Sequence, residues 1–146
     1  MMLCAFFKNH FFNLDVHLFE NKSEDFQKNL HDIFTIIRNE NPDAPIYMVG
    51  LFNPYLSYFS EIVEIEEIVQ IWNETSRQVI SKFPNTQFVS IDSIFTDEEK
   101  LLLHEDFFHP NRLGYELIAD KLLNQMELDG DFVFVPHDTN ARGETN

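Results

Sequence analysis

The sequence is short of cysteine and of basic residues, and each shortage excludes a class of site. Cys4 is the single cysteine among 146 residues, so neither an intrachain disulfide nor a cysteine-based zinc site is available. Lys and Arg number 10 against 25 Asp and Glu, which gives a formal net charge of −15. Because nucleic acid is held by clustered basic side chains, no nucleic-acid partner is expected, and anionic membranes should repel the chain.

Long apolar runs are also missing. Residues 1–7 are largely apolar, but they carry no basic residue, and Lys8 interrupts them. This stretch is too short to span a bilayer and lacks the charged start of a secretion signal. As written, the chain is therefore predicted to stay in the cytoplasm.

Apolar residues, by contrast, are plentiful. They make up 44% of the chain, which is enough for the core of one domain or less. Apolar periodicity, caps and breakers predict helices and strands in alternation. Two long helices are predicted at 23–38, with Ser23 as N-cap, and at 61–83. A short helix is predicted from a capping box of Thr96 and Glu99 through Leu103, and a last helix follows Asn111. The predicted strands are 46–52, 87–91 and a brief 132–135. This alternation is typical of an α/β fold with a parallel sheet, and a polar tail follows it.

Two apolar stripes indicate which helix faces are buried. The first predicted helix places on one face Phe26, Leu30, Ile33, Phe34 and Ile37. The glutamates of the 61–83 helix mostly lie off its apolar face, which favours a solvated surface over a cation site. Asn53 and Tyr55 follow the first strand, where α/β proteins build their sites, and are candidates to line a pocket.

The strongest candidate for chemistry is the pair Asp106 and His109. A neutral imidazole takes a proton from a nucleophile when a carboxylate holds its other nitrogen in the right tautomer, and this spacing allows that. Pro110 biases His109 toward an extended backbone, which leaves Asn111 free to cap the next helix. Two alternatives remain open: an ordinary surface hydrogen bond, and a metal site that adds His104 and Glu105 to the pair.

The wider run favours catalysis. Asp106-x-x-His109-Pro-Asn, followed by Gly114-Tyr115 and Ile118-Ala119, resembles the last conserved block of the SGNH (GDSL-type) serine esterases and lipases. The resemblance implies Asp106 as orienting carboxylate and His109 as base of a Ser-His-Asp triad. It also implies a three-layer, flavodoxin-like domain with a parallel sheet, no cofactor or metal, and a small-molecule ester or lipid-like substrate. Full-length relatives of this kind are expected to be exported or membrane-anchored.

The other blocks of that family do not occur in the sequence. Gly50, Gly114, Gly130 and Gly143 are the only glycines, and none opens a Gly-Asp-Ser or a Gly-x-Asn-Asp. Asp92-Ser93 is preceded by Ile91. We therefore expect residues 1–136 to form the C-terminal portion of one SGNH domain, truncated at its N-terminus, with residues 137–146 a disordered tail.

Three expectations follow from the missing blocks. The chain lacks the catalytic serine and should be inactive alone. It should associate with the missing N-terminal half of the domain or with itself, because about five strands make up such a sheet and only two are strongly predicted. The alternative function is a non-catalytic acidic α/β interaction module.

Overall fold

The computed structural model describes residues 16–56, 58–96 and 100–131. The elements in order are α2 (Val16–Glu40), β1 (Ile46–Val49), α3 (Val63–Ile80), β2 (Thr86–Val89), the 3-10 turn η1 (Lys100–Leu102) and α4 (Arg112–Asp129). The predicted strand 132–135, the tail and part of the predicted capping box lie outside the described residues.

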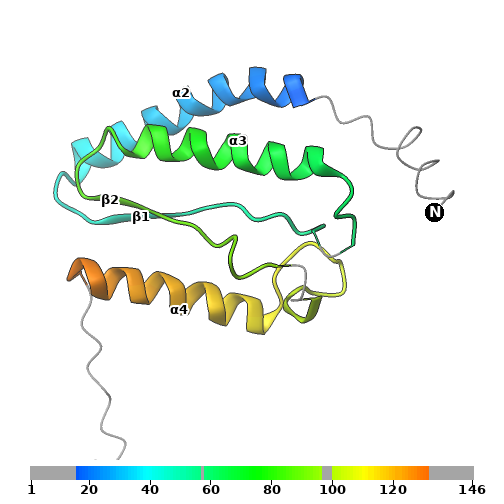
Figure 1. The fold of residues 1–146 in the computed structure, drawn as a ribbon. Coiled ribbons are helices and arrows are strands. Elements are labelled where there is room, and N and C mark those ends of the chain that lie inside the picture. The colour runs from blue at the N-terminus through cyan, green and yellow to red at the C-terminus, as the bar shows by residue number, and fades with distance from the viewer. Residues whose placement is uncertain (1–15, 57, 97–99, 132–146) are drawn as a thin grey trace, which may run out of the picture.

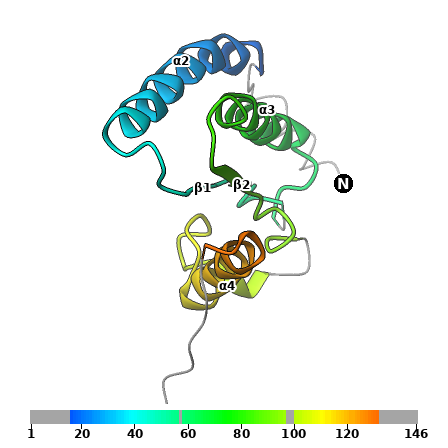
Figure 2. The ribbon, with the colours of Figure 1, turned by 90° about the vertical axis from the view of Figure 1, so that its left-hand side faces the viewer.

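The layers follow the predicted α/β pattern. β1 and β2 pair in parallel, with Ile46 opposite Thr86 and Val49 opposite Val89. Helices α2 and α3 cover one face of this pair and α4 covers the other, as Figure 1 and Figure 2 show. A parallel sheet between helical layers confirms the α/β class, and both strands are shorter than predicted.

Two details of the predicted first helix are wrong. Ser23 lies inside α2, and its hydroxyl donates to the Glu20 carbonyl at 2.7 Å, so it is not an N-cap. A serine hydroxyl inside a helix can donate its hydrogen bond to a carbonyl of the preceding turn, so the helix continues through Ser23. Ile33 was expected in the packed stripe, yet it is 51% exposed, while Leu30 and Phe34 are buried. Ile36 is exposed as well.

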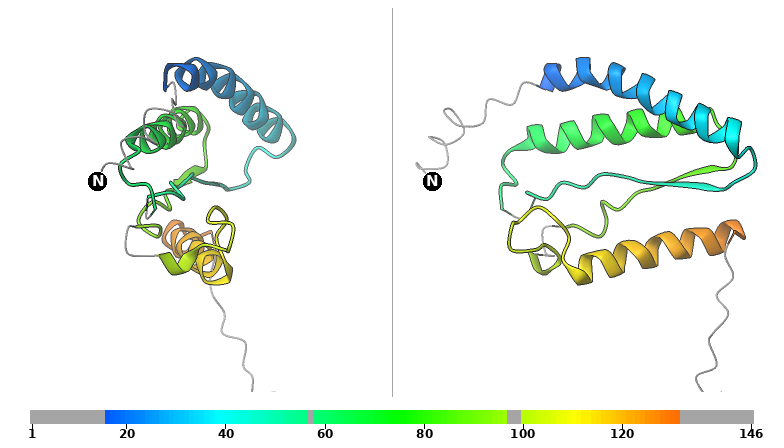
Figure 3. Two further views of the ribbon diagram at one scale, coloured as in Figure 1. Left: turned by 90° about the vertical axis from the view of Figure 1, so that its right-hand side faces the viewer. Right: turned by 180° about the vertical axis from the view of Figure 1, so that it is seen from behind.

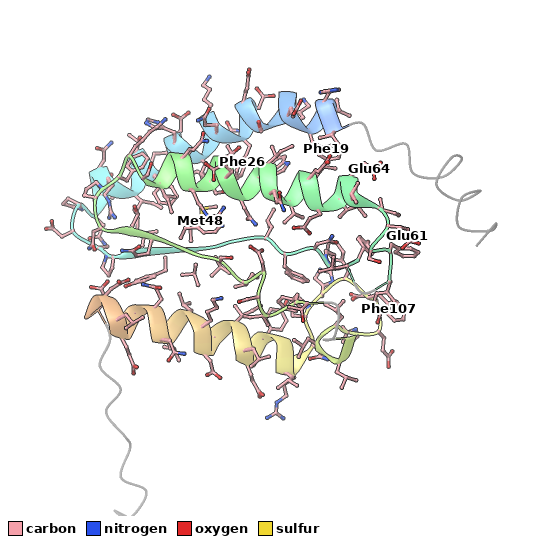
Figure 4. All side chains as sticks on the ribbon, in the orientation of Figure 1. Phe19, Phe26, Met48, Glu61, Glu64 and Phe107 are labelled. Atoms are coloured by element: carbon pink, nitrogen blue, oxygen red, sulfur yellow. The ribbon has the colours of Figure 1, made fainter. Side chains whose placement is uncertain are left out.

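Apolar contacts form two clusters, one for each helical layer. Leu30 and Phe34 of α2 meet Val79 and Ile80 of α3, with Met48 of β1 packed against them. Figure 4 shows Phe26 between the α2 and α3 ribbons and Met48 on β1 beneath them. Complete burial of a side chain such as Val79 stabilises the fold by roughly 1.5–3 kcal/mol.

The second cluster supports the loop that carries the candidate site. Ile91, Phe95 and Leu102 are buried together, and Val49 of β1 and Ile118 of α4 pack against them. Phe95 also stacks on Phe52, with ring centroids 3.8 Å apart. The loop therefore rests on a rigid apolar base.

Polar side chains close the remaining gaps between elements. Arg38 at the end of α2 donates to the carbonyls of Ala44 at 2.7 Å and Asn85 at 2.9 Å, which joins the connections that lead into the two strands. Buried Asn73 of α3 accepts from the Leu51 N–H at 2.8 Å and donates to the Leu51 carbonyl at 2.9 Å. No helix in the described ranges combines the length and apolar character that crossing a membrane requires.

Candidate active site

The segment between η1 and α4 is a closed loop. Leu103 and Pro110 form an antiparallel bridge, and the His104 N–H donates to the His109 carbonyl at 2.8 Å. The Phe107 N–H returns to the His104 carbonyl at 3.0 Å, and Phe107 has a left-handed φ of 57°. The chain thus reverses direction within the loop and brings Asp106 alongside His109.

Asp106 binds the loop with one oxygen and the imidazole with the other. Its Oδ1 accepts the backbone N–H groups of Phe108 and His109, each at 3.0 Å. Its Oδ2 lies 2.7 Å from Nδ1 of His109. A carboxylate can only accept, so Nδ1 is assigned as the donor, and the neutral ring then carries its acceptor lone pair on Nε2.

The same contacts set the charge of the carboxyl group. The hydrogen bond from the His109 ring holds the pKa of Asp106 well below its usual range, and the two backbone N–H groups lower it further. Asp106 therefore stays ionised at any ordinary pH. An ionised, fixed acceptor is what keeps an imidazole in one tautomer.

The start of α4 fixes the loop from behind. The Asn111 side chain accepts the Gly114 N–H at 3.1 Å, which confirms the predicted N-cap. The Asn111 amide also donates to the carbonyls of Leu101 and Leu103, which lie across the base of the loop. A Cβ on Gly114 would come within 2.6 Å of the Leu102 carbonyl oxygen, so glycine is needed for this close approach.

The pair is open on one side and walled by apolar groups on the other. The side chains of His109 and Asp106 are 64% and 46% exposed. The Phe108 ring meets the imidazole edge-on with centroids 4.9 Å apart. His109 also lines a pocket of about 460 Å³ together with Leu51, Phe52, Tyr55, Ile65, Val69, Phe108, Tyr115 and Ile118.

Tyr55 and Asn53 behave differently, although both were candidates to line a pocket. Tyr55 does line the pocket beside His109. Asn53 is instead buried, accepts the Tyr55 N–H at 2.9 Å and donates to Glu66 at 3.2 Å. It shapes the turn that carries Tyr55.

Phe108 and Tyr115 are among the pocket residues that sequence reasoning missed. Both lie within the motif around His109, and their position next to the base was the signal available. Phe107, the neighbour of Phe108 in the loop, meets Tyr58 edge-on with ring centroids 5.1 Å apart and is labelled at the loop end of the molecule in Figure 4.

The other candidate chemistries find less support in the described part of the chain. No three His, Cys, Asp or Glu side chains there form a group that would hold a metal ion, so the metal-site alternative has no donor set. Ser93 belongs to Asp92-Ser93, the part of the sequence most similar to the nucleophile motif, and its hydroxyl oxygen accepts a hydrogen bond from Nζ of Lys121 at 2.7 Å. Among the described residues, no hydrogen bond joins His109 to a serine.

Comparison with known proteins decides the family. The model of the GDSL-like lipase/acylhydrolase family matches residues 15–117, which include the loop, its cap and Gly114. The chain belongs to this family of hydrolases. It is also similar to an uncharacterized protein, YpmR, of Bacillus subtilis (strain 168), with 28% identity over 130 residues. The match covers 88% of this chain and 51% of the relative, so the chain spans about half the relative's length.

Proposed function

We propose that this chain supplies the base and the orienting carboxylate of an acyl-ester hydrolase with a Ser-His-Asp triad. The observation that carries the proposal is the hydrogen bond from Nδ1 of His109 to a carboxylate that two backbone N–H groups already hold in place. Family membership supports an ester or lipid-like substrate.

The chemistry uses the free ring nitrogen. Nε2 of His109 takes the proton as a serine hydroxyl attacks the ester carbonyl, and Asp106 stabilises the resulting imidazolium. The proton then passes from Nε2 to the departing alcohol oxygen, and the same exchange with water releases the acid. The apolar pocket beside His109 suits an acyl group.

The family's Gly-Asp-Ser does not occur in the sequence, so in this proposal another polypeptide segment supplies the serine. The 146-residue chain alone should therefore hydrolyse nitrophenyl acetate and butyrate no faster than its His109→Ala variant. An activated nucleophile and oxyanion donors supply most of the rate enhancement in such enzymes, so a chain that has neither should show no rate that depends on His109. A clear rate advantage for the unsubstituted chain would show that it contains a nucleophile of its own.

The roles of Asp106 and His109 are tested after this chain is joined to the segment of the Bacillus subtilis protein that lies outside the match. In a joined protein that hydrolyses esters, His109→Ala should remove nearly all esterase activity. Asp106→Asn should lower kcat by about 10²–10⁴ with little change in KM, because an amide allows the wrong tautomer and does not stabilise the cation.

His104→Ala is the matched control, because His104 lies in the same loop and uses its backbone, not its ring, in the loop's hydrogen bonds. Its activity should stay close to that of the parent. If His104→Ala were as damaging as His109→Ala, His109 would not be the base. If the joined protein showed no esterase activity while the Bacillus subtilis protein did, the interaction-module alternative would be favoured.

A further inference from the structure

Two segments rich in aromatic residues meet beside the candidate site. One follows β1 and contains Tyr55, Tyr58 and Phe59, and the other is the loop that contains Phe107 and Phe108. Both segments lie at the end of the molecule where α3 and α4 begin, as Figure 1 and the right view of Figure 3 show. Rings from the two segments are in contact, so side chains far apart in the sequence form one surface there.

A continuous row of rings begins at the proposed base. The Phe108 ring meets the imidazole of His109 with centroids 4.9 Å apart. Beyond it, the Tyr55 ring lies 6.2 Å from Phe108 and 6.2 Å from Phe59, again between centroids. We call Phe108, Tyr55 and Phe59 the ring row. Its first two members line the pocket beside His109, and Phe59 extends the row past that pocket.

Backbone hydrogen bonds and a second ring contact hold the row in place. The Phe59 N–H donates to the Tyr55 carbonyl at 2.7 Å, which closes the turn between these two members. Phe107 meets Tyr58 with centroids 5.1 Å apart and so joins the two segments a second time. Phe107 does this from a left-handed φ of 57°, a backbone conformation that a bulky residue rarely adopts. The turn itself would favour glycine or asparagine, so the ring at this position serves the contact between the segments.

The exposure and charge of these segments indicate what the ring row can bind. Phe108 and Phe59 are 48% and 46% exposed, so these rings present apolar surface beside a candidate site. Segments 53–60 and 104–110 contain no lysine or arginine, Asp106 is a carboxylate, and the whole chain has a formal net charge of −15. An anionic ligand would find no cation to pair with here. The ligand that fits is therefore apolar and uncharged.

We infer that the ring row binds the hydrocarbon chain of an uncharged ester and favours medium-length chains, such as octanoyl, over acetyl. The inference rests on the proposed function, because the row begins at His109, where the ester bond would lie. Each methylene buried against the rings tightens binding by up to about fourfold. The effect depends on position along the row: a short chain reaches Phe108, whereas only a longer chain reaches Phe59.

The first test is titration of the 146-residue chain with butanol and with octanol, followed by NMR. Both alcohols are uncharged, and their binding needs no nucleophile, so the result does not depend on catalysis. Octanol should bind at least about tenfold more tightly than butanol and should shift the amide signals of Phe59 and Phe108. Shifts confined to residues beneath α2, such as Trp72, would overturn the inference.

Variants at the two ends of the row test its direction. Phe59→Ala should weaken octanol binding at least about threefold and leave butanol binding unchanged, whereas Phe108→Ala should weaken the binding of both. Phe59→Leu keeps apolar surface and should retain most of the octanol affinity, which separates a lost contact from a lost fold. Leu128→Ala is the control, because Leu128 is 82% exposed near the far end of α4, and it should change neither affinity. Equal effects of Phe59→Ala on the two alcohols, or no effect on either, would overturn the inference.

The second test uses the protein joined to the unmatched segment of the Bacillus subtilis relative. Its kcat/KM should be higher for nitrophenyl octanoate than for nitrophenyl butyrate, and Phe59→Ala should lower the value for octanoate at least about threefold without changing the value for butyrate. Ester hydrolysis without this chain-length preference would overturn the inference and leave the triad standing. An inactive joined protein whose octanol binding still depends on Phe59 would support the ring row and count against the triad. Loss of octanol binding in the joined protein would show that polypeptide covers the rings, which would also overturn the inference.

Discussion

Removal of the Asn111 side chain should loosen the whole loop that carries Asp106 and His109. Asn111→Ala loses the N-cap of α4, worth about 1 kcal/mol, and two amide donations across the base of the loop. Each of those is worth roughly 0.5–1.5 kcal/mol, so we expect a loss of about 2–4 kcal/mol in the free energy of unfolding. For a chain of this length that corresponds to a fall of roughly 5–15 °C in Tm.

The assay is urea unfolding followed by circular dichroism, with Asn111→Asp beside Asn111→Ala. Aspartate caps a helix as well as asparagine does, but it has no amide to donate to Leu101 and Leu103 and would bring a negative oxygen toward their carbonyls. Asn111→Asp should therefore lose at least half as much as Asn111→Ala.

Asn124→Ala is the control, because Asn124 lies exposed on α4 and should change stability by less than about 0.5 kcal/mol. If Asn111→Asp proved as stable as the parent, the amide contacts would contribute nothing, and the loop would have to be held by its apolar base alone.

Two further predictions concern acid stability and the buried Asn73. The pKa of Asp106 is lowered in the folded chain, so its stabilising contribution is complete above about pH 4, the value of an unfolded aspartate, and is lost as the pH falls through the lower folded value. The difference in urea midpoint between the parent and Asp106→Asn should therefore shrink between about pH 6 and pH 2, and a difference that stayed constant would contradict the assigned hydrogen bonds. Asn73→Leu leaves the Leu51 N–H and C=O unpaired and should cost about 2–4 kcal/mol in urea unfolding. Ser76→Ala on the same buried face should cost less, because that hydroxyl bonds only within its own helix, to Trp72, and equal losses would argue against a special role for Asn73.

The candidate site was largely predictable because its contacts are short in sequence. Asp106 binds groups two and three residues away, and Asn111 caps a group three residues away. Such contacts follow from the residue types and from the restriction that Pro110 places on His109. From the spacing alone, a surface hydrogen bond and a metal site both remained possible. Whether a third metal-binding side chain lies near the pair depends on the fold, and none does among the described residues.

The missed features involve partners far apart in the chain. Leu51 and Asn73 are 22 residues apart, and Arg38 reaches Asn85, 47 residues on. No local pattern marks these side chains, because asparagine and arginine on a helix are usually solvated. The predicted start of the first helix was wrong for a related reason. The packing of α2 on α3 stabilises the helix more than propensity or a cap residue does, so the helix continues through Ser23.

The exposure of Ile33 shows that a periodic pattern marks the face of a helix that favours burial but not the limits of the buried area. Its spacing with Leu30 and Phe34 is the spacing of a buried stripe, and the pattern correctly marks the side chain as one that favours burial. Leu30 and Phe34 meet Val79 and Ile80 of α3, whereas Ile33, at the margin of the same stripe, stays exposed. The whole fold decides which neighbour a helix packs against, so local periodicity alone does not fix where the buried stripe of α2 ends.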